Sequence, residues 1–138
     1  MRGRGIEPSQ YTILASAPQD VPSYLCAGDA GLSFIKPCFS KLASSPTKNS
    51  EYLACGLPLI INAGIGDSDG LITQERVGAL VKEFTESEYA RAIQTIEALL
   101  QDTHVTRRRT RDVAERLFDV RVAGAERYSR LYEMVLAR

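Results

Sequence analysis

Pro58–Ala63 (PLIINA) is the segment that most constrains how the chain can fold, because it is almost wholly apolar and has Gly56 and Gly64 on either side. A strand with one solvated face alternates apolar and polar residues, whereas a strand of a parallel sheet, covered by helices on both faces, is a continuous apolar run. Glycines are typical of the turns that bound such a strand. The segment therefore predicts a buried strand in a parallel sheet.

Other short apolar segments predict further strands at Tyr11–Ala17, Ala30–Ile35 and Gly78–Val81. Apolar spacing, caps and glycine stops predict helices at Val21–Ala27, from Pro46 to Cys55, and at Gly70–Glu75, Glu86–Gln101, Thr103–Leu117 and Asp119–Ala137. We therefore expect an α/β fold class: a partial Rossmann-like parallel sheet of about four strands, flanking helices on both faces and a helical C-terminal tail packed at one side. Residues 1–10 are expected to form a flexible tail, followed by one domain over residues 11–138.

The charge composition argues against nucleic acid as a partner. Lys+Arg and Asp+Glu both number 17, whereas binding to a phosphate backbone usually needs a basic excess. No apolar run approaches the ~20 residues that span a bilayer, and the polar N-terminus does not resemble a signal peptide. The cysteines Cys26, Cys38 and Cys55 have neither metal-site nor disulfide-framework spacing. Reduced thiols in a cytoplasmic protein are therefore expected.

The strongest candidate site is the start of the helix at Pro46. A helix N-terminus presents unpaired backbone N–H groups and the positive end of the helix dipole, which together bind anions. Ser45 and Thr47 add hydroxyl groups, and Lys48 adds a charge that the dipole disfavours unless an anion is bound. Glu51 shares a helix face with Lys48, where its carboxylate could accept hydrogen bonds from a ribose.

The same residues also have a purely structural explanation. Ser45 would cap the helix and Pro46 would take its first position. Lys48 and Glu51 would then form an exposed ion pair worth well under ~1 kcal/mol. The spacing alone leaves this alternative open.

The string SPTKNSEYLACGLPLIINAGIGD, residues 45–67, resembles the signature of the C-terminal, donor-binding domain of GT-B glycosyltransferases of the family-4 type (glycosyl transferases group 1). The strings AGDAGLSFIKP and FDVRVAGAERYSRLYEMVLA are similar to other parts of that domain. The resemblance implies a partial nucleotide-sugar-binding domain in which Glu51 holds the nucleotide ribose. Ser45, Thr47 and Lys48 would contact the diphosphate or sugar of a nucleotide-diphospho-sugar. The implied reaction transfers the sugar to a glycan or lipid-linked acceptor, with no metal or other cofactor.

The chain departs from this family at two places. Ala43 lies eight residues before Glu51, where many relatives have a second glutamate that contacts the donor sugar. The acceptor-binding domain and the first βα units of the donor domain are not visible, so Tyr11–Ala17 would lack its usual neighbour in the sheet. We expect the open edge to be repaired by repositioning of this segment, by dimerisation or strand swapping with a second copy, or by a separate chain.

Residues outside this motif have competing interpretations. Asp67 and Asp69 match a D-x-D metal pattern, but helix capping by Asp67 or Ser68 is expected instead. The turn Gly64–Gly66 could approach a ligand, but a tight connection from strand to helix is the simpler role. His104, the only histidine, has no evident catalytic partner.

A basic run lies in the predicted helix Thr103–Leu117. It could touch anionic lipid, which leaves peripheral membrane association open. Acidic residues within helical reach favour a solvated, salt-bridged face instead. The basic residues are Arg107, Arg108, Arg109 and Arg111, and the acidic residues are Asp112, Glu115 and Asp119.

A second class of function also stays open: a non-catalytic remnant or assembly subunit that keeps the fold without transferase activity. The missing front half favours this class, whereas Lys48 and Glu51 favour retained donor binding. A response-regulator-like signalling domain is disfavoured, because the predicted strand ends Ala17, Lys36 and Ala63 carry no acidic phosphoacceptor.

Overall fold

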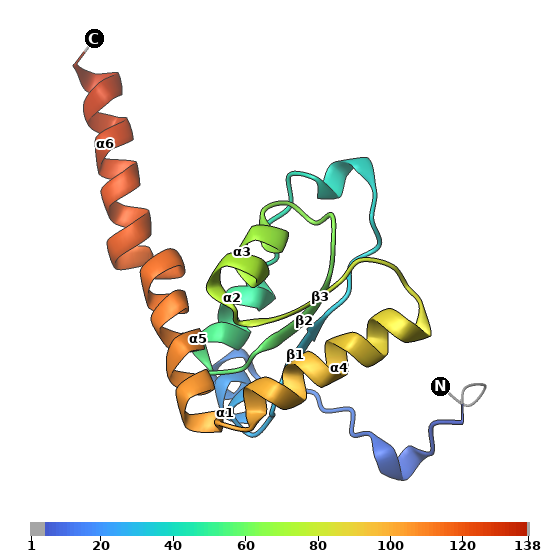
Figure 1. Cartoon of the computed structure of the whole chain (residues 1–138). Helices are drawn as coiled ribbons and strands as arrows, with labels where there is room; N and C mark the ends of the chain where they lie inside the picture. Colours follow the sequence, from blue (N-terminus) through green and yellow to red (C-terminus); the bar gives the residue numbers. More distant parts are fainter. Residues whose placement is uncertain (1–4, 138) are drawn as a thin grey trace.

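The computed structural model describes residues 5–137 and has a mixed α/β architecture (Figure 1). Three parallel strands, β1 (Gly31–Ser33), β2 (Leu59–Asn62) and β3 (Gly78–Val81), form an open sheet in the order β1-β2-β3. The buried strand expected at Pro58–Ala63 is therefore confirmed as the central one. Residues 1–4 of the predicted N-terminal tail lie outside the described residues.

Helices cover both faces of this sheet, as predicted. Helices α2 (Thr47–Ala54), α3 (Ser68–Glu75) and α5 (Thr103–Phe118) lie on one side, and α4 (Glu86–Leu100) lies on the other (Figure 1). Leu59 and Ile61 join the apolar cluster of the first side, whereas Ile60 packs with the cluster of the second. This division follows from the strand geometry, since successive side chains of a strand point to opposite faces.

Close packing joins α2 to β1. Gly31 in β1 lies against the ring of Tyr52 in α2, and a methyl group at this position would overlap the ring. The glycine therefore allows α2 to approach the edge strand. Helix α1 (Val21–Cys26) precedes β1 and has no buried residue.

The strand predicted at Tyr11–Ala17 is wrong. The segment is extended without strand partners, and its residues are exposed, with Ile13 at 80%. It is bounded by 3₁₀ turns at Pro8–Gln10 and Pro18–Asp20. A β-forming composition is not sufficient for a strand, because a strand is stable only when hydrogen-bonded to a neighbour. The described residues thus form three strands rather than about four.

The last predicted helix is divided and only partly packed. A π-helical turn, Val120–Gly124, follows α5, and α6 (Ala125–Leu136) then projects away from the sheet (Figure 1). The expected packing of this tail against the sheet is wrong for α6, which has no buried residue. The apolar side chains on which the predicted helix Asp119–Ala137 was based are exposed to solvent: Val122 in the π-helical turn, and Tyr128, Leu131, Tyr132, Val135 and Leu136 in α6.

Candidate functional site

Helix α2 begins one residue later than the sequence predicted. Pro46, with φ −68° and ψ 112°, is the N-cap residue, and Thr47 is the first helical residue. The predictions that Ser45 is the N-cap and that Pro46 is helical are therefore wrong, because the extended ψ of Pro46 delays the first helical turn. No side chain caps this helix. The backbone N–H groups at Thr47 and Lys48 consequently have no side-chain acceptor.

The start of α2 lies at the carboxyl ends of β1 and β2. Two loops meet there, because the N–H of Gly66 donates to the carbonyl of Lys41 at 3.0 Å. Gly66 has φ 53°, and its α-carbon abuts the Ser44 carbonyl so closely that no side chain would fit. The turn Gly64–Gly66 thus has the structural role expected of a tight connection. In open α/β sheets, the carboxyl ends of the strands are where ligands bind.

Asp69 has a structural partner in this turn. Its two carboxylate oxygens accept the backbone N–H of Gly64 at 3.1 and 3.2 Å. Asp67 occupies the N-cap position of α3, but its side chain makes no capping hydrogen bond, so the expected capping of this helix by a side chain is wrong. Within residues 5–137, no cluster of three or more His, Cys, Asp or Glu side chains is placed to hold a metal ion.

A cluster of buried polar side chains lies below the start of α2. Both polar atoms of the Asn62 side chain have a partner, since its Oδ1 accepts the Ile35 N–H at 2.7 Å and its Nδ2 donates to the Ala63 carbonyl at 3.2 Å. The hydroxyl of Ser33 and the Oδ1 of Asn49 have no partner, although these residues are only 3% and 4% exposed. Both border one narrow space that has no room for a water molecule. Its other lining residues are Ile35, Pro46, Ile61, Asn62, Ile65 and Ser68.

These unpaired atoms are notable because buried polar groups in proteins almost always have a hydrogen-bond partner. Neither Ser33 nor Asn49 was predicted as a site residue from the sequence. Two sequence features could have pointed to buried polar groups here. One is a polar residue inside an apolar strand, at Ser33 and at Asn62, and the other is an amide in the first turn of α2, at Asn49.

Three of the predicted site residues, Thr47, Lys48 and Glu51, lie in α2, and the fourth, Ser45, lies just before it. Ser45 and Thr47 are exposed, Lys48 is half-buried, and Glu51 is exposed one turn further along. Lys48 and Glu51 do not form the alternative ion pair, because neither belongs to an ion pair found among residues 5–137. The hydroxyl of Ser50 donates to the Thr47 carbonyl at 2.7 Å, inside the helix.

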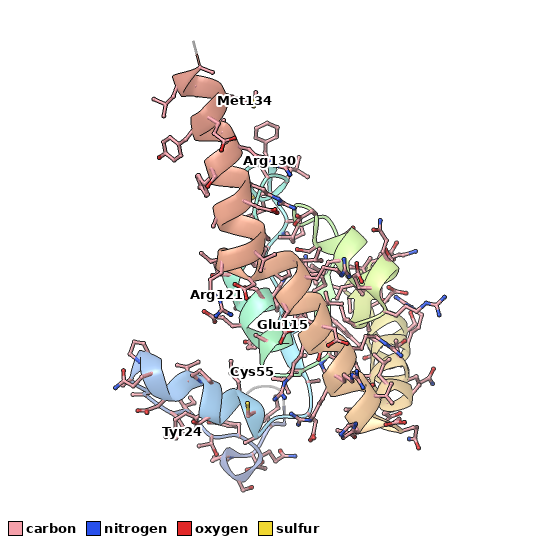
Figure 2. All side chains as sticks on the ribbon, turned by 90° about the vertical axis from the view of Figure 1, so that its left-hand side faces the viewer. Tyr24, Cys55, Glu115, Arg121, Arg130 and Met134 are labelled. Atoms are coloured by element: carbon pink, nitrogen blue, oxygen red, sulfur yellow. The ribbon has the colours of Figure 1, made fainter. Side chains whose placement is uncertain are left out.

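Glu51 opens onto a pocket of about 390 Å³ between α2 and α5, which we call the α2–α5 groove. Its apolar walls come from Ala54, Ala114 and Phe118. Figure 2 faces this side of the molecule and labels Glu115 and Arg121 along it. The full lining is Ser50, Glu51, Ala54, Arg111, Ala114, Glu115, Phe118, Asp119 and Arg121.

The charges of the groove are partly paired. Arg121 donates to Asp119 at 2.9 Å, and hydrogen bonding from Arg121 lowers the pKa of the Asp119 carboxyl group. Arg111 has no ion-pair partner among residues 5–137. Arg111 and Glu51 therefore line the same groove, and the Arg111 guanidinium group is not paired with a carboxylate.

The basic run of α5 does not form the predicted salt-bridged face. Arg107 donates to the Gly28 carbonyl at 2.8 Å, and Arg109 donates to the Arg76 carbonyl at 3.4 Å. Carbonyl groups beyond helix C-termini lack intrahelical donors, which explains why these guanidinium groups bind there. The ion pair that α5 does form joins Arg116 to Glu75 at 2.6 Å.

His104 is exposed in the first turn of α5, and no described nucleophile is hydrogen-bonded to it. Within the part of the chain that the structure describes, no helix is long and apolar enough to cross a membrane.

No family model, curated protein or solved structure matches this chain. Its function must therefore be inferred from the geometry around α2.

Proposed function

We propose that this chain is the donor-binding part of a GT-B-type glycosyltransferase of the family-4 type, with a partial Rossmann-like sheet. It binds a nucleotide-diphospho-sugar at the start of α2. One observation carries the proposal: an uncapped helix N-terminus lies at the carboxyl ends of two parallel strands, above the unpaired polar atoms of Ser33 and Asn49.

The diphosphate is assigned to the first turn of α2. The N–H groups of Thr47 and Lys48 are unpaired by side chains, and they carry the positive end of the helix dipole. Lys48 adds a full positive charge at the same end. Without an anion this arrangement is unfavourable, so a bound diphosphate explains why a lysine occupies it. Ser45 and Thr47 supply exposed hydroxyl groups to the same ligand.

The nucleoside is assigned to the α2–α5 groove. Its volume of about 390 Å³ falls within the roughly 300–1,000 Å³ of typical small-molecule sites. Glu51 lies on its wall, where the carboxylate accepts hydrogen bonds from two ribose hydroxyls. This role resembles that of the acidic residue in dinucleotide sites. Ala54 and Phe118 offer apolar surface to the base.

The proposed chemistry is positional and electrostatic. A sugar passes from the nucleotide to a glycan or lipid-linked acceptor, and the leaving diphosphate gains negative charge as the bond breaks. The α2 N-terminus and Lys48 stabilise that charge. No described residue near α2 is assigned as a general base, so that role is left to another part of the enzyme.

A calorimetric titration with UDP, GDP and ADP tests this proposal. We expect one nucleotide to bind with a micromolar to low-millimolar Kd, and Glu51→Ala and Lys48→Ala each to weaken it about tenfold. Glu97→Ala is the matched control, since Glu97 is exposed on α4, across the sheet. Folded protein that binds none of the nucleotides at millimolar concentration would contradict the proposal.

The alternative, an assembly subunit without transferase activity, is favoured by the exposed apolar residues of α6. Leu131 and Val135 are more than half exposed, as are Tyr128 and Tyr132. Light scattering over a concentration series distinguishes the two roles. Self-association that Leu131→Glu abolishes, without nucleotide binding, would support the assembly role.

A further inference from the structure

Two of the three cysteines lie against each other at the junction of α1 and α2. Cys26 is the last residue of α1, and Cys55 directly follows α2. The Sγ of Cys26 is 3.9 Å from the Cys55 carbonyl oxygen, and the Sγ of Cys55 is 3.9 Å from the Pro22 carbonyl oxygen. In an α-helix the carbonyl of residue 22 accepts the N–H of residue 26. Each thiol therefore lies against the segment that carries the other thiol, and both thiols are free.

The two thiols differ in accessibility. Cys26 is exposed, whereas Cys55 is only 8% exposed and lies beside α1 and α2 (Figure 2). Burial raises the pKa of the Cys55 thiol, and the neighbouring Cys26 raises it further. An oxidant from solution therefore reaches Cys26 first, and Cys55 is the thiol placed to react with the product.

The end of α1 is held in position for this reaction. Arg107 of α5 donates to the Cys26 carbonyl at 3.4 Å and to the Gly28 carbonyl at 2.8 Å. Helix α1 buries no residue of its own. Its attachment to the domain thus depends on few contacts, and a covalent bond at Cys26 would strengthen it.

We propose that Cys26 and Cys55 are a redox-sensitive pair that closes to a disulfide with a low-molecular-weight disulfide such as oxidised glutathione. The Cys26 thiolate attacks one glutathione sulfur, which breaks the S–S bond and releases one glutathione thiol. The Cys55 thiolate then attacks the Cys26 sulfur of the mixed disulfide and releases the second glutathione. Two protein thiols are oxidised, one glutathione disulfide is reduced, and the protons leave on the released thiols.

The disulfide would enclose the chain between Cys26 and Cys55, which contains β1 and the whole of α2. A cross-link over a loop of this length restricts the unfolded chain. We expect the oxidised protein to have a Tm about 10 °C above that of the reduced protein. Reduction by dithiothreitol returns the Tm to its original value.

The test is mass spectrometry of the whole chain after incubation with oxidised glutathione, alkylation of the remaining thiols and trypsin digestion. Cys26 and Cys38 are separated by a single lysine, Lys36, which precedes Pro37 and is a poor trypsin site. The Cys38→Ser variant is therefore the form that assigns the bond. We expect a linked Cys26–Cys55 peptide in wild type and Cys38→Ser, and none in Cys26→Ser.

Cys38 is the internal control, because it is exposed and its Sγ lies 3.3 Å from the Ser40 hydroxyl rather than beside another cysteine. Circular dichroism of each variant in reducing buffer establishes that it is folded. Separate glutathione adducts on Cys26 and Cys55 of the folded Cys38→Ser variant, or two alkylated thiols, would overturn the proposal. A wild-type bond to Cys38 would overturn it as well.

Discussion

The side-chain oxygen of Asn62, at the end of β2, accepts the backbone N–H of Ile35 at 2.7 Å. This bond joins the residues that follow β1 to the central strand, beyond the last paired residue of the ladder. Asn62 is 2% exposed and also donates to the Ala63 carbonyl. A buried amide thus holds together the loops that border the start of α2.

Replacement of Asn62 should therefore disturb both stability and the site. Asn62→Ala leaves the Ile35 N–H without its partner, so we expect a loss of about 1–3 kcal/mol in the free energy of unfolding. Urea denaturation measures this loss. Gln94→Ala, which replaces an exposed amide on α4, is the control and should change the stability by less than about 0.5 kcal/mol. Equal stability of both variants would show that the Asn62 bonds are not important.

The glycines of the turn after β2 form a matched pair. Gly66→Ala places a methyl group against the Ser44 carbonyl at φ 53°, whereas Gly64→Ala at φ 80° meets no atom within 4 Å. Gly64→Ala should cost only the left-handed backbone strain of about 1–2 kcal/mol. Gly66→Ala should cost more, because the neighbouring loop must also move. Denaturation curves of the two variants give the comparison, and a larger loss for Gly64→Ala would contradict the turn geometry.

Ser33 offers a test of whether its unpaired hydroxyl serves a ligand. In the free protein, Ser33→Ala removes a buried group without a partner, so we expect unchanged or slightly higher stability, by about 0–1 kcal/mol. The space beside this hydroxyl has no room for a water molecule, so the same variant should leave nucleotide binding unchanged in calorimetry. Weaker binding by Ser33→Ala would show that the hydroxyl serves a ligand, and a clear loss of stability would show that it has a structural partner.

The lowered pKa of Glu88 leads us to expect a specific pH dependence of the free energy of unfolding. Hydrogen bonds from Arg91 and from the Lys82 backbone lower its pKa to about 2. A carboxyl group whose folded pKa lies below its unfolded value of about 4.3 stabilises the fold above that value. The contribution is lost as the pH falls through about 2.

Glu88→Gln should accordingly lower the free energy of unfolding at pH 7, and its difference from wild type should shrink between about pH 4 and pH 2. Urea denaturation over this pH range checks the effect. Glu97→Gln, exposed on the same helix, is the matched control and should show no such trend. A difference that stays constant with pH would mean that the carboxylate charge is unimportant.

Segments with strong local patterns were predicted well. Strand β3 has the predicted bounds Gly78–Val81, and α4 differs from its prediction by one residue at its end. In both, apolar periodicity and flanking turn residues are properties of the segment itself. The α/β class followed from their alternation, because short apolar strands separated by amphipathic helices can bury their apolar sides in few other ways.

The three-dimensional structure decided the rest. Tyr11–Ala17 has a β-forming composition, but a strand forms only beside a hydrogen-bonding neighbour, and no local pattern shows whether one is present. Ser33 and Asn49 come from different elements and meet only because α2 packs on β1. The sequence thus indicated α2 as the candidate site through its residue types. The unpaired polar atoms beneath it depend on contacts between distant segments, which local sequence patterns do not specify.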